Sequence, residues 1–100
     1  MAKVDWAPEA EDCLRDIHDF VAETSPESAL KLVQSLIQRS FILREFPELG
    51  YRLRERPHEH IRVIVFGQYR MPYRLKASGD IDIIGVFHGR MDMERLLRKL

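Results

Sequence analysis

The residues best suited to chemistry end the last apolar run of the chain, IDIIGVFHGRMD at residues 81–92. His88 can exchange a proton near neutral pH, and Arg90 can hold a phosphate or carboxylate through forked hydrogen bonds. Gly89 permits a positive φ that would turn the chain away from a sheet. We expect Asp92 to cap a following helix. On these residues alone, a structural role is favoured for His88 and Arg90.

A second candidate group lies in YRMPYRL, residues 69–75. Alternate side chains of a strand share a face, so Arg70 and Arg74 are expected on one face and the tyrosines on the other. Arg62, on a neighbouring strand, is expected to lie beside this arginine row. Such a row can hold phosphates or carboxylates. The alternative is an ordinary polar, solvent-facing side of an antiparallel sheet.

Metal and cofactor chemistry finds little support in the sequence. His58 and His60 are spaced like a weak metal pair, but no third ligand is evident, and a loop explains them better. The chain has no glycine-rich phosphate loop and no helical zinc motif. Cys13 is the single cysteine, so an internal disulfide is impossible, and it falls among apolar helical positions. We predict no cofactor and no metal.

Length and composition indicate one globular domain spanning residues 1–100. No apolar run approaches the roughly 20 residues that a membrane helix needs. The acid-rich N-terminus lacks the apolar core of an export signal, so a cytoplasmic protein is expected. Two bases and eight acids give residues 1–30 a net charge of −6, and fourteen bases and eight acids give residues 31–100 a net charge of +6. Within that second part, residues 51–76 carry seven bases against two acids. A basic half of this kind can attract nucleic acid or an acidic protein segment.

The periodicity of apolar residues predicts two helices near the N-terminus. After a short first strand ending at Trp6, Pro8 suits a first helical turn, and an apolar stripe continues to Val21. Thr24 or Ser25 is expected to cap a second helix, which the pattern carries on toward Phe46. The short turn between the helices implies an antiparallel helical hairpin.

Strands are predicted over the second half of the chain. Residues 61–66, 69–75 and 81–89 alternate or form apolar runs, and the connections between them are short enough for hairpins. Pro72 cannot donate to a ladder, so it should face outward on an edge or sit at a bulge. Residues 51–60 are expected to form a ragged edge strand or a loop, and residues 90–100 a short terminal helix. The predicted fold is α+β: an N-terminal strand, then the helical hairpin packed on a three- to four-stranded antiparallel sheet, then the short C-terminal helix.

In this order and spacing, the motifs resemble the ParE/RelE toxin superfamily of bacterial type II toxin–antitoxin modules. The segments that carry the resemblance are VDWAPEAEDCLRDIHDFV, LREFPELGYRLR, YRMPYRL and IDIIGVFHGRMD. They span nearly the whole chain, and the HGR.D ending is closer to ParE than to RelE. The resemblance implies a toxin of this fold, neutralised by a cognate ParD- or RelB-like antitoxin whose C-terminal segment orders on the toxin surface.

The resemblance implies one of two activities. ParE-like members poison DNA gyrase by direct contact without catalysis, whereas RelE-like members cut mRNA on the ribosome. As a ribonuclease the chain would use Arg70, which matches an arginine of the RelE strand motif, with His88 or Arg90 as acid or phosphate clamp. The last tyrosine is Tyr73, so the C-terminal tyrosine usual in RelE is missing, which favours ParE.

The resemblance also indicates a binding surface, whichever activity applies. We expect the target or the antitoxin to dock on residues of the basic half, namely Arg62, Arg70, Arg74, His88 and Arg90. A member of the fold that has lost toxicity and survives as a binding module is the remaining alternative.

Overall fold

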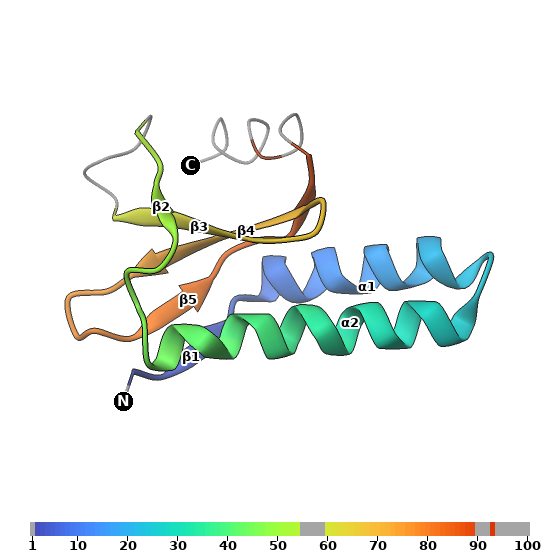
Figure 1. Cartoon of the computed structure of the whole chain (residues 1–100), viewed down its shortest axis with the longest axis horizontal. Helices are drawn as coiled ribbons and strands as arrows, with labels where there is room; N and C mark the ends of the chain where they lie inside the picture. Colours follow the sequence, from blue (N-terminus) through green and yellow to red (C-terminus); the bar gives the residue numbers. More distant parts are fainter. Residues whose placement is uncertain (1, 55–59, 90–92, 94–100) are drawn as a thin grey trace.

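The computed structural model describes residues 2–54, 60–89 and 93. Two helices form one layer and a twisted sheet forms the other, as Figure 1 shows, so the predicted α+β fold is confirmed. The elements are β1 (Val4–Trp6), α1 (Pro8–Ala22), α2 (Pro26–Ser40), a 3₁₀ helix η1 (Phe41–Arg44), β2 (Tyr51–Arg52), β3 (Ile61–Phe66), β4 (Tyr69–Leu75), β5 (Ile81–Ile83) and β6 (Phe87–His88). None of the described helices is long and apolar enough to cross a membrane.

The helical hairpin forms where the sequence predicts it. Pro8 occupies the first turn of α1, where its missing N–H has no partner to lose. Ser25 caps α2, since its Oγ accepts a hydrogen bond from the Ser28 N–H at 3.2 Å. The chain leaves α2 through η1 rather than continuing as regular helix to Phe46.

The sheet has the order β1-β5-β4-β3-β2 among the described residues, and β6 also pairs with β4. All pairs are antiparallel except β1 with β5, which run parallel. Its helix-facing side supplies Met71, Tyr73, Ile81 and Ile83 to a core shared with the helices. A smaller apolar cluster that includes Ile61 and Val63 lies on the opposite side, which we call the distal face.

Pro72 lies in a central strand, opposite a bulge. Tyr73 pairs with Ile83, but Tyr69 pairs with His88, so the β5–β6 segment carries one extra residue between these pairs. The Pro72 carbonyl still accepts from the Ile84 N–H at 3.0 Å. The missing N–H therefore falls where the ladder is already interrupted, and the bulge alternative predicted for Pro72 is confirmed, whereas the edge alternative is wrong.

Candidate functional site

The two faces of β4 separate the candidate residues. Arg70 pairs with Val65 and Arg74 with Ile61, which places both arginines on the distal face. Tyr73, between them in alternation, is buried against the helices. The predicted separation of arginines from tyrosines is therefore correct for this strand.

Arg70 lies in an exposed patch with Tyr51 and Val65. The Arg70 Nη1 donates to the Tyr51 Oη at 2.7 Å, and this bond links β4 to the edge strand β2 across β3. Tyr51 remains 43% exposed and Val65 41% exposed. We call these three residues the Tyr51–Arg70 patch. Tyrosine and arginine are the side chains most enriched at the energetic centres of protein interfaces, so this composition suits a protein partner.

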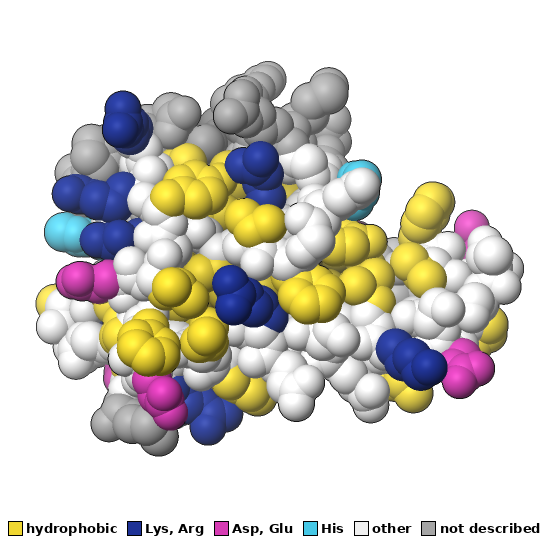
Figure 2. Space-filling model, viewed as in Figure 1, with side chains coloured by type: hydrophobic (Ala, Val, Ile, Leu, Met, Phe, Trp, Pro, Cys, Tyr) yellow, Lys and Arg dark blue, Asp and Glu magenta, His cyan; other side chains and the backbone are white. Residues whose placement is uncertain are grey.

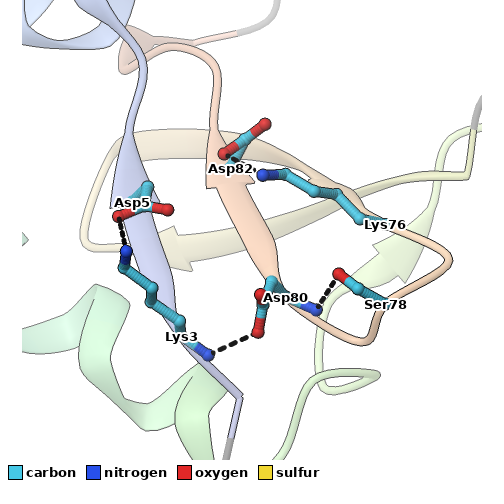
Figure 3. A network of polar contacts seen from close by, with 6 residues as sticks. All are labelled: Lys3, Asp5, Lys76, Ser78, Asp80 and Asp82. Carbon is cyan, nitrogen blue, oxygen red and sulfur yellow. Dashed lines mark hydrogen bonds and ion pairs between the residues drawn. The ribbon is translucent and has the colours of Figure 1, made fainter.

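Arg74 lies in a different electrostatic setting. It pairs in register with Asp82 of β5, which in turn pairs with Asp5 of β1. The Asp82 carboxylate also lies 3.2 Å from the Lys76 Nζ, an ion pair drawn in Figure 3. Asp82 therefore lies beside Arg74 in the ladder, whereas the described partner of Arg70 is the Tyr51 phenol.

Further polar contacts at this corner of the sheet connect β1 to the β4–β5 turn. In Figure 3 the Lys3 N–H donates to Asp80 Oδ1 at 3.0 Å, and the Asp80 N–H donates to Ser78 Oγ at 3.3 Å. Lys3 Nζ also lies 3.9 Å from Asp5 Oδ1. Because these charged groups are largely exposed, each contact stabilises the fold little. The corner is better explained as a connection between strands than as a functional site.

Arg62 does not join the arginine row, contrary to the sequence prediction. It pairs with Tyr73, and side chains directly opposite in a ladder share a face, so Arg62 lies on the helix-facing side. Its Nη1 donates to the carbonyls of Glu48 at 3.2 Å and Gly50 at 3.0 Å. The prediction was wrong because the face of a residue depends on strand register, which the sequence did not fix for β3 against β4.

The Tyr73 hydroxyl also holds residues 47–50, through two hydrogen bonds. Its Oη donates to the Pro47 carbonyl at 2.7 Å and accepts from the Gly50 N–H at 3.0 Å. Burial raises the pKa of the Tyr73 phenol from its usual 10.0, and the Gly50 hydrogen bond and the Arg62 charge oppose that rise. The phenol is therefore neutral at physiological pH, and with Arg62 it fixes residues 47–50 on the sheet.

His88 lies on the opposite face from Arg70. It pairs with Tyr69 and packs against that ring edge-to-face at 5.3 Å between centroids. Its Nε2 lies 2.7 Å from Gln68 Oε1. Gly89 has φ +78°, which confirms the predicted turn out of the strand. The predicted ribonuclease pair of Arg70 and His88 is thus divided between the two sides of the sheet.

Three predictions about the chain terminus remain untested. Arg90 and Asp92 lie outside the described residues, as does most of the expected terminal helix. Met93, which is described, is buried with the distal apolar cluster.

Sequence reasoning missed Arg52, which lies directly opposite Arg62 in the β2–β3 ladder. The two arginines line a hollow of about 270 Å³ with Glu48 and His60, which we call the basic hollow. His60 has φ +54°, an uncommon conformation for a residue with a side chain. Like charges directly opposite each other are destabilising in a ladder. The alternation in YRLR, residues 51–54, indicates that Arg52 and Arg54 share one face of a strand. It does not indicate which residues of the neighbouring strand lie opposite them.

The described residues give no support to a metal centre. They contain no group of three histidine, cysteine or acidic side chains placed to hold a metal ion. His58, the other half of the weak histidine pair, lies outside the described residues. The described site is therefore one of arginine, tyrosine and apolar side chains, suited to binding anions or protein surfaces.

Solved structures of toxin–antitoxin complexes share this fold. A chain of the chromosomal ParDE system from P. aeruginosa aligns with a TM-score of 0.73 and 23% identity, covering 90% of this chain and 98% of that one. A chain of the RelBE2 toxin–antitoxin complex from Mycobacterium tuberculosis aligns with a TM-score of 0.64 and 21% identity, covering 87% and 96%. At these identities the likeness establishes the fold. Comparison with curated proteins finds no match.

A family model assigns the chain to the class of small toxins of type II toxin–antitoxin systems. The model of the ParE toxin family, described as the ParE toxin of the type II system parDE, matches residues 4–93. The match covers most of the chain, so the chain belongs to the ParE toxin family, as the sequence motifs indicate.

Proposed function

We propose that this single-domain protein inhibits DNA gyrase by direct binding in the cytoplasm and is held inactive by a cognate antitoxin. Membership of the ParE family supports a toxin. The observation that carries a binding mechanism is the Tyr51–Arg70 patch, in which Tyr51 and Val65 stay exposed beside an arginine. Side chains of these kinds, presented on a sheet, lose little conformational freedom when a protein partner covers them.

The activity is tested with purified gyrase and relaxed plasmid. We expect the protein to block supercoiling and to trap gyrase–DNA cleavage complexes, and we expect Arg70→Ala to weaken both effects. Arg15→Ala is the matched control, because Arg15 is an exposed arginine on α1 whose described partner is Asp12. Unchanged supercoiling at large molar excess of toxin would remove gyrase as the target.

The partner that silences the toxin is proposed to be a ParD- or RelB-like antitoxin. Both solved relatives are toxin–antitoxin complexes, which supports a partner of this class. We expect its C-terminal segment to order across both sides of the sheet, near Arg70 and Arg74 on the distal face and near His88 on the helix-facing side. Co-expression with the neighbouring open reading frame should restore growth, and deletion of that partner's C-terminal segment should abolish the rescue.

A ribosome-dependent ribonuclease is the second candidate, favoured by the basic hollow. Arg52 and Arg62 face each other there, and paired guanidinium groups suit a phosphate. Cleavage of mRNA on programmed ribosomes that is lost in Arg52→Ala would establish this activity at the basic hollow. Loss in Arg70→Ala or His88→Ala would instead assign it to the face of the sheet that carries that residue. A protein that does neither, and whose overexpression without antitoxin is harmless, would be a non-toxic binding module.

A further inference from the structure

Residues 46–49 expose two large apolar side chains on a fixed backbone. Phe46 is 55% exposed and Leu49 48% exposed, and both follow η1, of whose residues Leu43 is buried. Their segment is held by the hydrogen bonds of Tyr73 and Arg62 described above. A large apolar side chain on a rigid segment binds a partner at small entropic cost, because little freedom remains to be lost.

These side chains border a cavity of about 650 Å³, which we call the apolar groove. It lies between residues 46–49 and the end of β4, where Leu75, Lys76 and Gly79 form the other wall. This volume falls within the range of about 300–1,000 Å³ that is typical of ligand pockets. The groove therefore has room for a large apolar side chain.

The apolar groove continues into the basic hollow. Glu48 and Leu75 line both, so the two sites share a wall. In Figure 2 hydrophobic and basic side chains lie next to each other at the end of the molecule that carries β2 and the β4–β5 turn. An extended chain that fills the groove would therefore pass directly to Arg52 and Arg62.

The charges of the two sites favour a particular occupant. Lys76 at the groove has its charge offset by Asp82 at 3.2 Å. The basic hollow instead holds Arg52 opposite Arg62, with Glu48 as its acidic wall residue. A carboxylate placed between the two guanidinium groups would relieve their repulsion and accept forked hydrogen bonds.

We propose that the apolar groove and the basic hollow together dock an extended segment of a partner protein. One large apolar side chain of that segment fills the groove, and a carboxylate at the next position on the same face lies between Arg52 and Arg62. Alternate side chains of an extended chain share a face, so one residue separates the two anchors. The surface lies on the other side of the sheet from the Tyr51–Arg70 patch, and the proposal does not depend on which cellular target the toxin has.

Amide chemical shifts of the ¹⁵N-labelled full-length protein test the proposal with three blocked peptides. GSFSESG carries both anchors, GSFSKSG reverses the charge, and GSSSESG lacks the apolar anchor. We expect GSFSESG to give saturable shifts at Leu49, Gly79 and Arg52 with a dissociation constant on the order of 1 mM, and at least about fivefold weaker binding for each control peptide. Equal affinity for GSFSKSG, or no saturation by GSFSESG, would overturn the proposal.

Two matched variants separate docking from folding. Phe46→Ser and Phe20→Ser each remove an exposed phenylalanine, and Phe20 is 76% exposed on α1. We expect Phe46→Ser to weaken GSFSESG at least about fivefold and Phe20→Ser to leave it unchanged, with both amide spectra remaining dispersed. Equal losses in the two variants would refute the site. Sedimentation of the wild type as a dimer that Phe46→Ser dissociates would assign the groove to a second copy of this chain and also refute it.

Discussion

Replacing Tyr73 with phenylalanine isolates the hydrogen bonds that fix residues 47–50. The substitution keeps the buried ring but removes the Oη that donates to the Pro47 carbonyl and accepts from the Gly50 N–H. Leaving a buried donor unsatisfied costs about 1–3 kcal/mol, so we expect Tyr73→Phe to lower the free energy of unfolding by roughly 2 kcal/mol. For a domain of this size that corresponds to a fall in Tm of roughly 8–16 °C.

The same variant gives a pH signature. The folded state raises the pKa of Tyr73 above 10.0, so it holds the phenolic proton more tightly than the unfolded chain does. This contribution to stability is fully present below pH about 10 and is lost as the pH rises through the folded pKa. Urea unfolding at neutral pH and again above pH about 10 should therefore show the difference between wild type and Tyr73→Phe shrinking as the pH rises.

The control is Tyr69→Phe, because the ring of Tyr69 makes its described contact with His88. We expect that variant to stay within about 0.5 kcal/mol of wild type. If Tyr73→Phe were equally mild, or if its deficit did not change with pH, the phenol would not be the clamp that holds residues 47–50.

Substitutions at three further positions test other parts of the account. Gly50→Ala places a methyl group 2.7 Å from the Val63 carbonyl oxygen and should cost at least about 1–3 kcal/mol in urea unfolding, and a neutral result would refute the close packing. Ser25→Ala removes the cap of α2 and should cost about 1 kcal/mol, measured in the same way, whereas Ser25→Gly should cost a few tenths. Arg52→Glu replaces the repulsive cross-strand pair of Arg52 and Arg62 by an attractive one. We therefore expect the free energy of unfolding to rise by about 0.2–1 kcal/mol and the affinity for GSFSESG to fall. A loss of stability would contradict the placement of the two arginines opposite each other.

Local sequence signals were sufficient to predict where the two helices begin. Pro8 and the Ser25 cap mark the beginnings of α1 and α2 within the chain, and both positions are explained by backbone groups a few residues away. The end of α2 was less well predicted. Apolar periodicity continues toward Phe46, but the chain tightens into η1 at Phe41, a change that periodicity alone does not reveal.

Contacts between distant strands were beyond local signals. Arg62 was expected beside Arg70, yet a shift of register by one residue moves a side chain to the other face, and nothing near Arg62 in the sequence sets that register. The parallel pairing of β1 with β5 joins residues almost eighty positions apart. The extra residue opposite Pro72 likewise depends on two separate pairings of β4.

The residues of the candidate site likewise divide into those that local sequence signals placed correctly and those that depend on contacts between distant strands. Arg70 and Arg74 were correctly placed on one face because they belong to a single regular strand. Tyr51 and Arg52 were missed because their importance comes from neighbours across the sheet, Arg70 in one case and Arg62 in the other. Residue type and alternation therefore predicted the chemistry of the surface, and the cross-strand register determined how it is arranged.

The most direct measurement of the central claim is the affinity of the purified protein for immobilised gyrase, compared among wild type, Arg70→Ala and Arg15→Ala. We predict saturable binding by wild type and Arg15→Ala, and at least about tenfold weaker binding by Arg70→Ala, a loss of about 1.4 kcal/mol, with the Tm of all three unchanged. The absence of wild-type binding, or equal affinity of Arg70→Ala, would contradict a gyrase inhibitor that acts through the Tyr51–Arg70 patch.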